Sequence, residues 1–239
     1  MPPSSTPLAH LDSAIAGAGV HQSPFAHAFV RDVFPQPYYE EMRNYFPDPD
    51  RLVTNGQAGR GNQLRARFVF ELKADYLSTL QGPQKEFWSD LSGWILGDSL
   101  RACILDKFSG TVEARFGRRD QSEYWSDAVL VEDHSTHSIG PHTDHPRKAV
   151  TLLFYLPGDD SQAHLGTSIY VPKDADFRCS GLAHHSFDKF DCVSTFPFVP
   201  NALVMFAKTD NSFHGIQPID DARCRRWLLM LNINVNSPR

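Results

Sequence analysis

Three residues of this sequence, His142, Asp144 and His214, have side chains that could bind one metal ion together. His142 and Asp144 are two positions apart, so on a strand they project from the same face, because side chains alternate along a strand. His214 supplies a third ligand much further along the chain. Two imidazoles and one carboxylate leave the other coordination positions of a metal open, and this set favours a ferrous ion that binds small molecules.

The segments beside these residues read as strands that could hold the ligands in place. An apolar run over residues 150–156 follows Asp144, and another over residues 202–207 ends shortly before His214. The chain has eleven histidines, so a histidine near an acid is weak evidence by itself. The position of both ligand groups next to predicted strands favours the metal site over ordinary hydrogen-bonded histidines.

The pattern along the chain predicts helices first and strands afterwards. The first half carries a strand over 25–34, a helix over 36–46, a short strand over 64–72 and helical spacing over 84–108 that is broken near Gly97. Seven strands are predicted in the second half, at residues 112–116, 128–133, 149–156, 167–171, 193–198, 202–207 and 227–235. Strands that follow one another without helices favour an antiparallel sandwich or barrel.

The fold class predicted from this order is mainly β, a two-sheet jelly roll with N-terminal helices packed on one face. Residues 1–23 are predicted to be a flexible N-terminal arm, and residues 24–239 a single domain. Within this domain, residues 35–108 are predicted to form a helical support, and residues from about 111 to 236 are predicted to form the β core.

Composition and charge exclude several classes of protein. The 239 residues are 41% hydrophobic and 21% charged, as in ordinary globular proteins. The net charge of −5, without a basic run, argues against nucleic acid as a partner, and no apolar stretch predicts a membrane span. The four scattered cysteines and the N-terminus without secretory features predict reduced thiols in a cytoplasmic protein. A small-molecule substrate is the expected partner, and a homodimer is left open.

Arginines open the last predicted strand and could bind a carboxylate. Arg223, Arg225 and Arg226 precede or begin this apolar strand, and the guanidinium fork matches a carboxylate with two hydrogen bonds. A dicarboxylic cosubstrate would supply the charged partner that a buried arginine needs. Alternation along the strand decides which one points inward; Arg226 is favoured, with Arg225 as the alternative.

Several of these segments together resemble the Fe(II)/2-oxoglutarate-dependent oxygenases, and in particular their prolyl-4-hydroxylase-like bacterial branch. The resemblance covers residues 129–235, and residues 24–46 resemble the entry of these proteins into their fold. It is carried by residues 140–144, 154–157, 165–170, 200–203 and 212–215 and by Arg226-Trp227.

The resemblance implies a double-stranded β-helix with His142, Asp144 and His214 as iron ligands and catalytic centre. It implies Fe(II), 2-oxoglutarate and O2 as cofactor and cosubstrates, and a basic residue, here Arg226 or Arg225, that binds 2-oxoglutarate. In the family this residue often lies two positions before Arg226, where this chain has Cys224. The reaction expected is hydroxylation of a C–H bond in an amino acid, a natural-product intermediate or a sugar derivative, with release of succinate and CO2.

Other outcomes of the same site stay open. Halogenases of this kind have a small residue in place of the carboxylate, so Asp144 favours hydroxylation, while demethylation and desaturation remain alternatives. A non-catalytic, cupin-like metal-binding or sensor module and a zinc hydrolase are the rivals from other classes. His145, Arg65 and Arg67 are the candidate substrate residues, and segments 55–67 and 172–191 are candidate lids.

Overall fold

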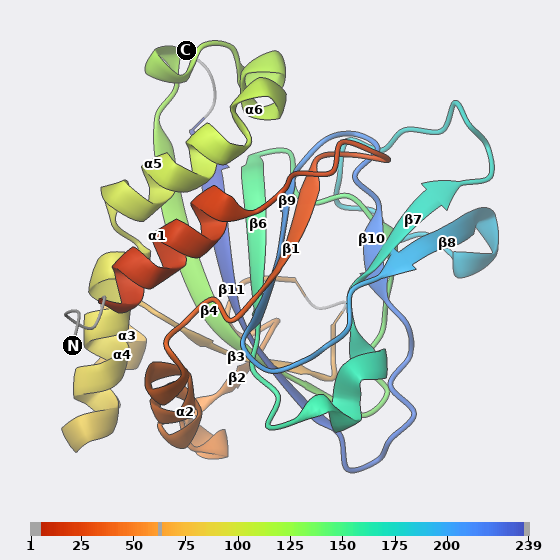
Figure 1. Cartoon of the computed structure of the whole chain (residues 1–239). Coiled ribbons are helices and arrows are strands. Elements are labelled where there is room, and N and C mark those ends of the chain that lie inside the picture. The colour runs from red at the N-terminus through yellow and green to blue at the C-terminus, as the bar shows by residue number, and fades with distance from the viewer. Residues whose placement is uncertain (1–5, 62–63, 237–239) are drawn as a thin grey trace.

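The computed structural model describes residues 6–61 and 64–236, and six α-helices, four short 3-10 helices and eleven strands run through this part of the chain (Figure 1). The helices are α1 (Pro7–Gly17), α2 (Gln36–Asn44), α3 (Ala74–Leu77), α4 (Gly82–Ile95), α5 (Asp98–Lys107) and α6 (Ser109–Phe116). The strands are β1 (His27–Arg31), β2 (Val53–Thr54), β3 (Arg67–Glu71), β4 (Tyr124–His134), β5 (Ile139–His142), β6 (Lys148–Tyr155), β7 (Ser168–Pro172), β8 (Phe190–Thr195), β9 (Ala202–Ala207), β10 (His214–Ile216) and β11 (Arg225–Val235).

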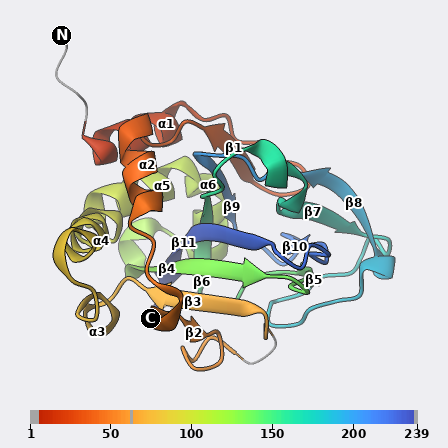
Figure 2. The ribbon, with the colours of Figure 1, turned by 90° about the horizontal axis from the view of Figure 1, so that it is seen from below.

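Two antiparallel sheets form the core of the fold. The large sheet has seven strands in the order β1-β9-β6-β11-β4-β3-β2, and the small sheet has four in the order β5-β10-β7-β8. Figure 2 shows β3, β4 and β11 side by side, with β5 and β10 at one end of them. The predicted two-sheet core is therefore confirmed.

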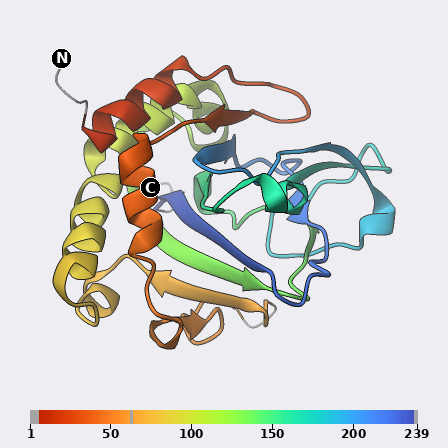
Figure 3. The same ribbon diagram turned by 60° about the horizontal axis from the view of Figure 1, so that its bottom comes forward.

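The central strands of the large sheet are buried on both faces, which explains their continuous apolar sequence. In β6, Leu152 and Phe154 pack with the helices, while Leu153 and Tyr155 pack with residues of the small sheet such as Ile169. Alternate side chains of one strand thus belong to two separate clusters. The helices cover the outer face of the large sheet, as predicted, and the small sheet covers its inner face (Figure 3).

The N-terminal segment differs from the expected flexible arm. Thr6 caps α1 by accepting a hydrogen bond from the backbone N–H of Ala9, and Leu11 and Ile15 are fully buried among the helices. Their four-residue spacing places both on the side of α1 that faces α5, so burial of this apolar stripe holds the helix in the fold. Residues 1–5 of the predicted arm lie outside the described residues.

Two other boundaries were wrong. Residues 112–116, predicted as a strand, belong to α6, because Val112 and Phe116 are four apart and pack on the helical side of the core. The division into a helical support and a later β core also fails, because β1 and β3 lie before or among the helices and join the large sheet. The break near Gly97 is confirmed between α4 and α5. Among the described residues, no helix is long and apolar enough to span a bilayer.

Candidate metal centre

His142, Asp144 and His214 meet at the end of the small sheet. Each offers a ligand atom, and these atoms all lie within 4.8 Å of one another. His142 ends β5 and His214 begins β10, and the two residues face each other directly in the antiparallel register, with ring centroids 4.3 Å apart. Pairing of β5 with β10 therefore brings together residues that are distant in the sequence.

Backbone hydrogen bonds orient both imidazoles in the same way. Nδ1 of His142 lies 3.0 Å from the carbonyl oxygen of Gly140, and Nδ1 of His214 lies 3.0 Å from that of Ser212. An Nδ1–H that donates to a carbonyl leaves the Nε2 lone pair free for a metal. Burial lowers the pKa of both histidines, which favours the neutral imidazole that binds metal ions.

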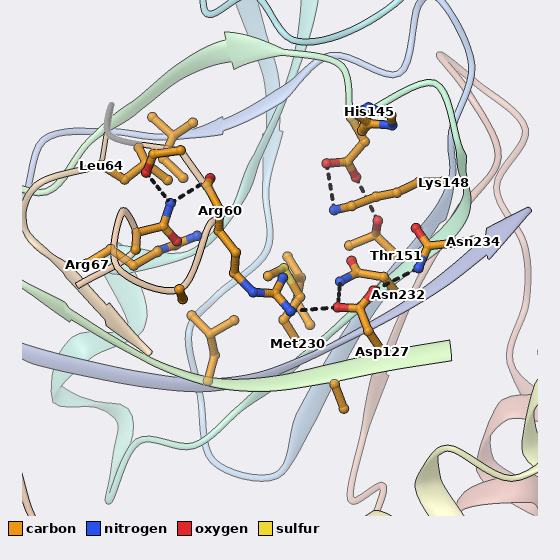
Figure 4. Close-up of a pocket in the computed structure, with 18 of the residues that line it drawn as sticks. Arg60, Leu64, Arg67, Asp127, His145, Lys148, Thr151, Met230, Asn232 and Asn234 are labelled. Carbon is orange, nitrogen blue, oxygen red and sulfur yellow. Dashed lines mark hydrogen bonds and ion pairs between the residues drawn. The ribbon is translucent and has the colours of Figure 1, made fainter. Parts of the chain in front are cut away.

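Two side chains of β6 hold the carboxylate of Asp144 (Figure 4). Lys148 Nζ donates a hydrogen bond of 2.9 Å to Oδ1, and Thr151 Oγ1 donates one of 2.6 Å to Oδ2. Burial alone would raise the pKa of Asp144, but the Lys148 ammonium, the neighbouring imidazoles and the Thr151 hydroxyl together lower it below its usual range. The carboxylate is therefore ionised and fixed in one orientation.

Arg226 lies fully buried in the same cavity as the triad. Its Nε donates to the carbonyl oxygen of Leu165 at 2.8 Å, and its Nη1 donates to Asp133 Oδ2 at 2.9 Å. The guanidinium carbon lies 4.5 Å from the ring centroid of Phe198, a cation–π contact. Nη2 is buried and has no hydrogen-bond partner among the described residues, so this donor is available to a ligand.

The surroundings of Arg226 carry an excess of positive charge. Arg67 binds Asp133 with both Nε and Nη2, at 2.6 and 2.9 Å, so one carboxylate is shared by two guanidinium groups. His137 also contacts Asp133, with its Nε2 3.3 Å from Asp133 Oδ1. Burial lowers the pKa of His137 to about 3, so this imidazole is neutral near pH 7. Two cations and one anion leave a net charge of +1, which suits a carboxylate ligand.

The structure separates the predicted site residues into two groups. The triad, His145, Arg67 and Arg226 line one cavity of about 970 Å³. Arg225 points the other way, with 55% of its side chain exposed and its Nη1 donating to Glu132 at 2.8 Å. Arg65 is exposed and is not among the described residues that line this cavity. Arg225 and Arg65 therefore do not face the site. Alternation along β11 turns Arg225 away from it, whereas Arg65 lies in the turn before β3.

The lid segments contribute to the cavity in different ways. Leu182 and His184 from the segment 172–191 line it. In the glycine-rich loop, Arg60 donates to Glu71 and to Asp127, both at 2.8 Å, and so ties the loop to the large sheet (Figure 4). Residues 62–63 of the predicted lid lie outside the described residues.

Sequence reasoning missed the side chains that support and extend the site. They are Lys148, Thr151, Asp127, Asp133, Asn232 and Asn234. A signal for the asparagines was present, because polar residues recur at alternate positions of an otherwise apolar final strand. Lys148 and Thr151 gave no such signal, since polar residues at the start of a strand are common.

Comparison with known proteins shows what this architecture resembles. No family model and no curated protein matches the sequence. A prolyl-4-hydroxylase from Pseudomonas putida superposes with a TM-score of 0.54 at 14% identity, over 94% of this chain and 98% of that one. HygX from Streptomyces hygroscopicus, solved with nickel, 2-oxoglutarate and hygromycin B bound, superposes with a TM-score of 0.50 at 13% identity, over 87% and 82%. The chain shares their fold. The double-stranded β-helix predicted from the sequence is thereby confirmed.

Proposed function

We propose that this protein is an Fe(II)- and 2-oxoglutarate-dependent dioxygenase that hydroxylates a C–H bond of a small molecule. The observation that carries the proposal is the meeting of His142, Asp144 and His214 within 4.8 Å, in a cavity that also contains Arg226 with a free donor. The shared fold with a prolyl-4-hydroxylase and with HygX, solved with nickel and 2-oxoglutarate bound, supports the same class.

The donor set fits a ferrous ion. Two neutral imidazoles and one ionised carboxylate form the ligand set of non-haem iron oxygenases, which leaves positions for a chelating cosubstrate and dioxygen. His142 and His214 would bind through Nε2, because their Nδ1 atoms face backbone carbonyl groups. Hydrogen bonds from Thr151 and Lys148 fix the orientation of the Asp144 carboxylate without a metal, so metal binding would require little rearrangement of this side chain.

The cluster around Arg226 fits the distal carboxylate of 2-oxoglutarate. The free Nη2 would donate to this carboxylate, and Asp133 positions the guanidinium from the other side. Leu153 and Leu228 also line the cavity and would offer apolar contacts to the carbon chain of such a ligand. Bound iron and 2-oxoglutarate would supply the oxidising chemistry, with succinate and CO2 released.

The retained Asp144 favours oxygenation over halogenation, because no ligand position is freed for a halide. The cavity volume of about 970 Å³ lies at the upper end of the range for small-molecule sites. A small organic substrate is therefore proposed, and demethylation or desaturation by the same oxidant is the alternative reaction. A cytoplasmic location and a homodimer remain predictions from the sequence.

The test is the visible charge-transfer band that forms when Fe(II) and 2-oxoglutarate bind together without oxygen. The band is expected in the unaltered protein, and it should be lost in His142→Ala and retained in the control His164→Ala, which replaces an exposed histidine. Succinate formed on adding oxygen separates an oxygenase from a metal-binding module. Hydrolysis with zinc in the absence of oxygen, without any such band, would instead support the hydrolase.

A further inference from the structure

A second polar cluster lines the same cavity, and we call it the carboxamide cluster: Asp127 of β4 with Asn232 and Asn234 of β11. Asn232 Nδ2 donates to Asp127 Oδ1 at 3.0 Å, and Asn234 Nδ2 donates to Oδ2 at 2.7 Å (Figure 4). Asn232 is 1% exposed and Asn234 6%. Burial of polar groups destabilises a fold unless they have hydrogen-bond partners. None of these three residues is a proposed metal ligand.

The carboxamide cluster lies beside the metal triad. Asn232 faces Thr151 directly on the neighbouring strand β6, and the Thr151 hydroxyl binds the carboxylate of Asp144. Side chains that face each other across an antiparallel pair have Cβ atoms about 5 Å apart. A molecule held by this cluster would therefore have its nearest atoms next to the proposed iron site.

The carboxamide cluster and Arg226 occupy opposite ends of the inner face of β11. Leu228 and Met230 lie between them on the same face of the strand, at alternate positions. Asn232 is six residues from Arg226, so their backbones are about 20 Å apart along the strand. Arg226 is assigned to the distal carboxylate of 2-oxoglutarate, so the cluster at the other end of this face is left to a different ligand.

Asn232 offers a hydrogen-bond acceptor that the described residues do not use. Its Oδ1 is buried and has no partner among them. The orientation of the amide is fixed, because a flipped Asn232 would place its oxygen against the ionised carboxylate of Asp127. A ligand at this point must therefore donate a hydrogen bond, as a hydroxyl does.

The charge of the cluster is already balanced. Arg60 Nη2 donates to Asp127 at 2.8 Å, so this carboxylate has a cationic partner and does not require a second one from the substrate. A ligand carboxylate or phosphate would meet Asp127 and the free Oδ1 of Asn232, which are both acceptors, and would be disfavoured. The cluster therefore fits a neutral donor better than an anion.

Trp125 completes the surroundings of the cluster. It lies two positions before Asp127 on the same face of β4, faces Asn234 across the strand pair, and lines the cavity with 39% of its surface exposed. A flat apolar surface next to hydrogen-bond acceptors suits a ring that has C–H groups on its face and hydroxyls at its edge. We propose that Trp125, Asp127, Asn232 and Asn234 bind a neutral hydroxylated ring, such as a sugar or cyclitol unit, as the substrate; this assignment rests on the proposed function.

The experiment is anaerobic titration calorimetry on the protein loaded with Fe(II) and 2-oxoglutarate. The probes are a methyl hexopyranoside and a cyclitol, with a hexuronic acid and a hexose phosphate as their anionic counterparts. Neutral rings should bind, and anionic ones should bind more weakly. Asn232→Leu removes one buried hydrogen bond, worth roughly 0.5–1.5 kcal/mol, and should weaken neutral-ring binding about two- to tenfold.

Two further variants make the titration decisive. Trp125→Ala changes a partly exposed side chain and should also weaken neutral-ring binding, even if Asn232→Leu fails to fold. The matched control Asn236→Leu alters an exposed asparagine just beyond β11 and should bind like the unaltered protein. The assignment would be overturned if anionic and neutral rings bound equally well, or if neither Asn232→Leu nor Trp125→Ala weakened the binding of neutral rings.

The charge-transfer band recorded on the same samples separates this failure from a failure of the proposed function. A band without ring preference rejects the carboxamide cluster as the substrate subsite and keeps the oxygenase. Absence of the band rejects the oxygenase, and the substrate assignment falls with it.

Discussion

Arg226→Met is expected to weaken 2-oxoglutarate binding strongly while leaving the protein folded. The substitution removes the free Nη2 donor, and a hydrogen bond between charged groups contributes about 1.5–3 kcal/mol, so the dissociation constant should rise roughly 10- to 150-fold. Folding should tolerate the change, because Asp133 keeps both of its hydrogen bonds from Arg67 and methionine fills much of the vacated volume.

The assay is anaerobic titration of 2-oxoglutarate into the Fe(II) protein, followed by the charge-transfer band. Arg225→Met is the matched control, since its guanidinium binds Glu132 at the surface, and it should leave the affinity within about twofold. Pyruvate lacks the distal carboxylate, so its weaker binding should be the same in Arg226→Met and in the unaltered protein.

Two results would refute the assignment of Arg226. One is a loss of 2-oxoglutarate affinity in Arg225→Met that is at least as large as in Arg226→Met, which would mean that the distal carboxylate does not bind Arg226 specifically. The other is an equal loss for pyruvate and 2-oxoglutarate in Arg226→Met, which would mean that the arginine supports the cavity without contacting the distal carboxylate. Circular dichroism of each variant checks that the fold is retained.

Three further outcomes follow from contacts around the cavity. Thr151→Val removes the hydroxyl that orients Asp144, and metal titration should show about tenfold weaker binding; unchanged affinity would contradict this role. His137 has its pKa lowered to about 3 by burial, so the unfolded chain binds its proton first as the pH falls below about 6.5. The free energy of unfolding should therefore decrease as the pH falls from 6.5 to 4. In His137→Gln, the slope of this free energy against pH, measured by denaturant unfolding, should be smaller by up to about 1.4 kcal/mol per pH unit than in the unaltered protein. Identical slopes in the two proteins would show that His137 is not buried in its neutral form. Arg60→Ala should release the glycine-rich loop, seen as faster amide exchange over residues 55–61 with unchanged exchange in β6.

The local pattern of the sequence pointed to the candidate metal ligands, which the structure brings together, and to the strands next to them. His142 and Asp144 are two apart beside the apolar strand β6, and the alternation of side chains is a property of the strand itself. The failure at α6 has an equally local reason. In residues 112–116 apolar and charged residues alternate as on a strand, but Val112 and Phe116, four apart, also share one side of a helix, and contacts with the other helices decided between the two.

The tertiary structure decided everything that depends on register between distant strands. Pairing of β5 with β10 places His214 against His142, and pairing of β6 with β11 places Asn232 against Thr151. Both faces of β11 are largely apolar, so its sequence alone could not tell which face lines a cavity, and hence which of Arg225 and Arg226 lies inside it. Alternation is set within one strand, whereas register and the choice of inner face are set by long-range packing.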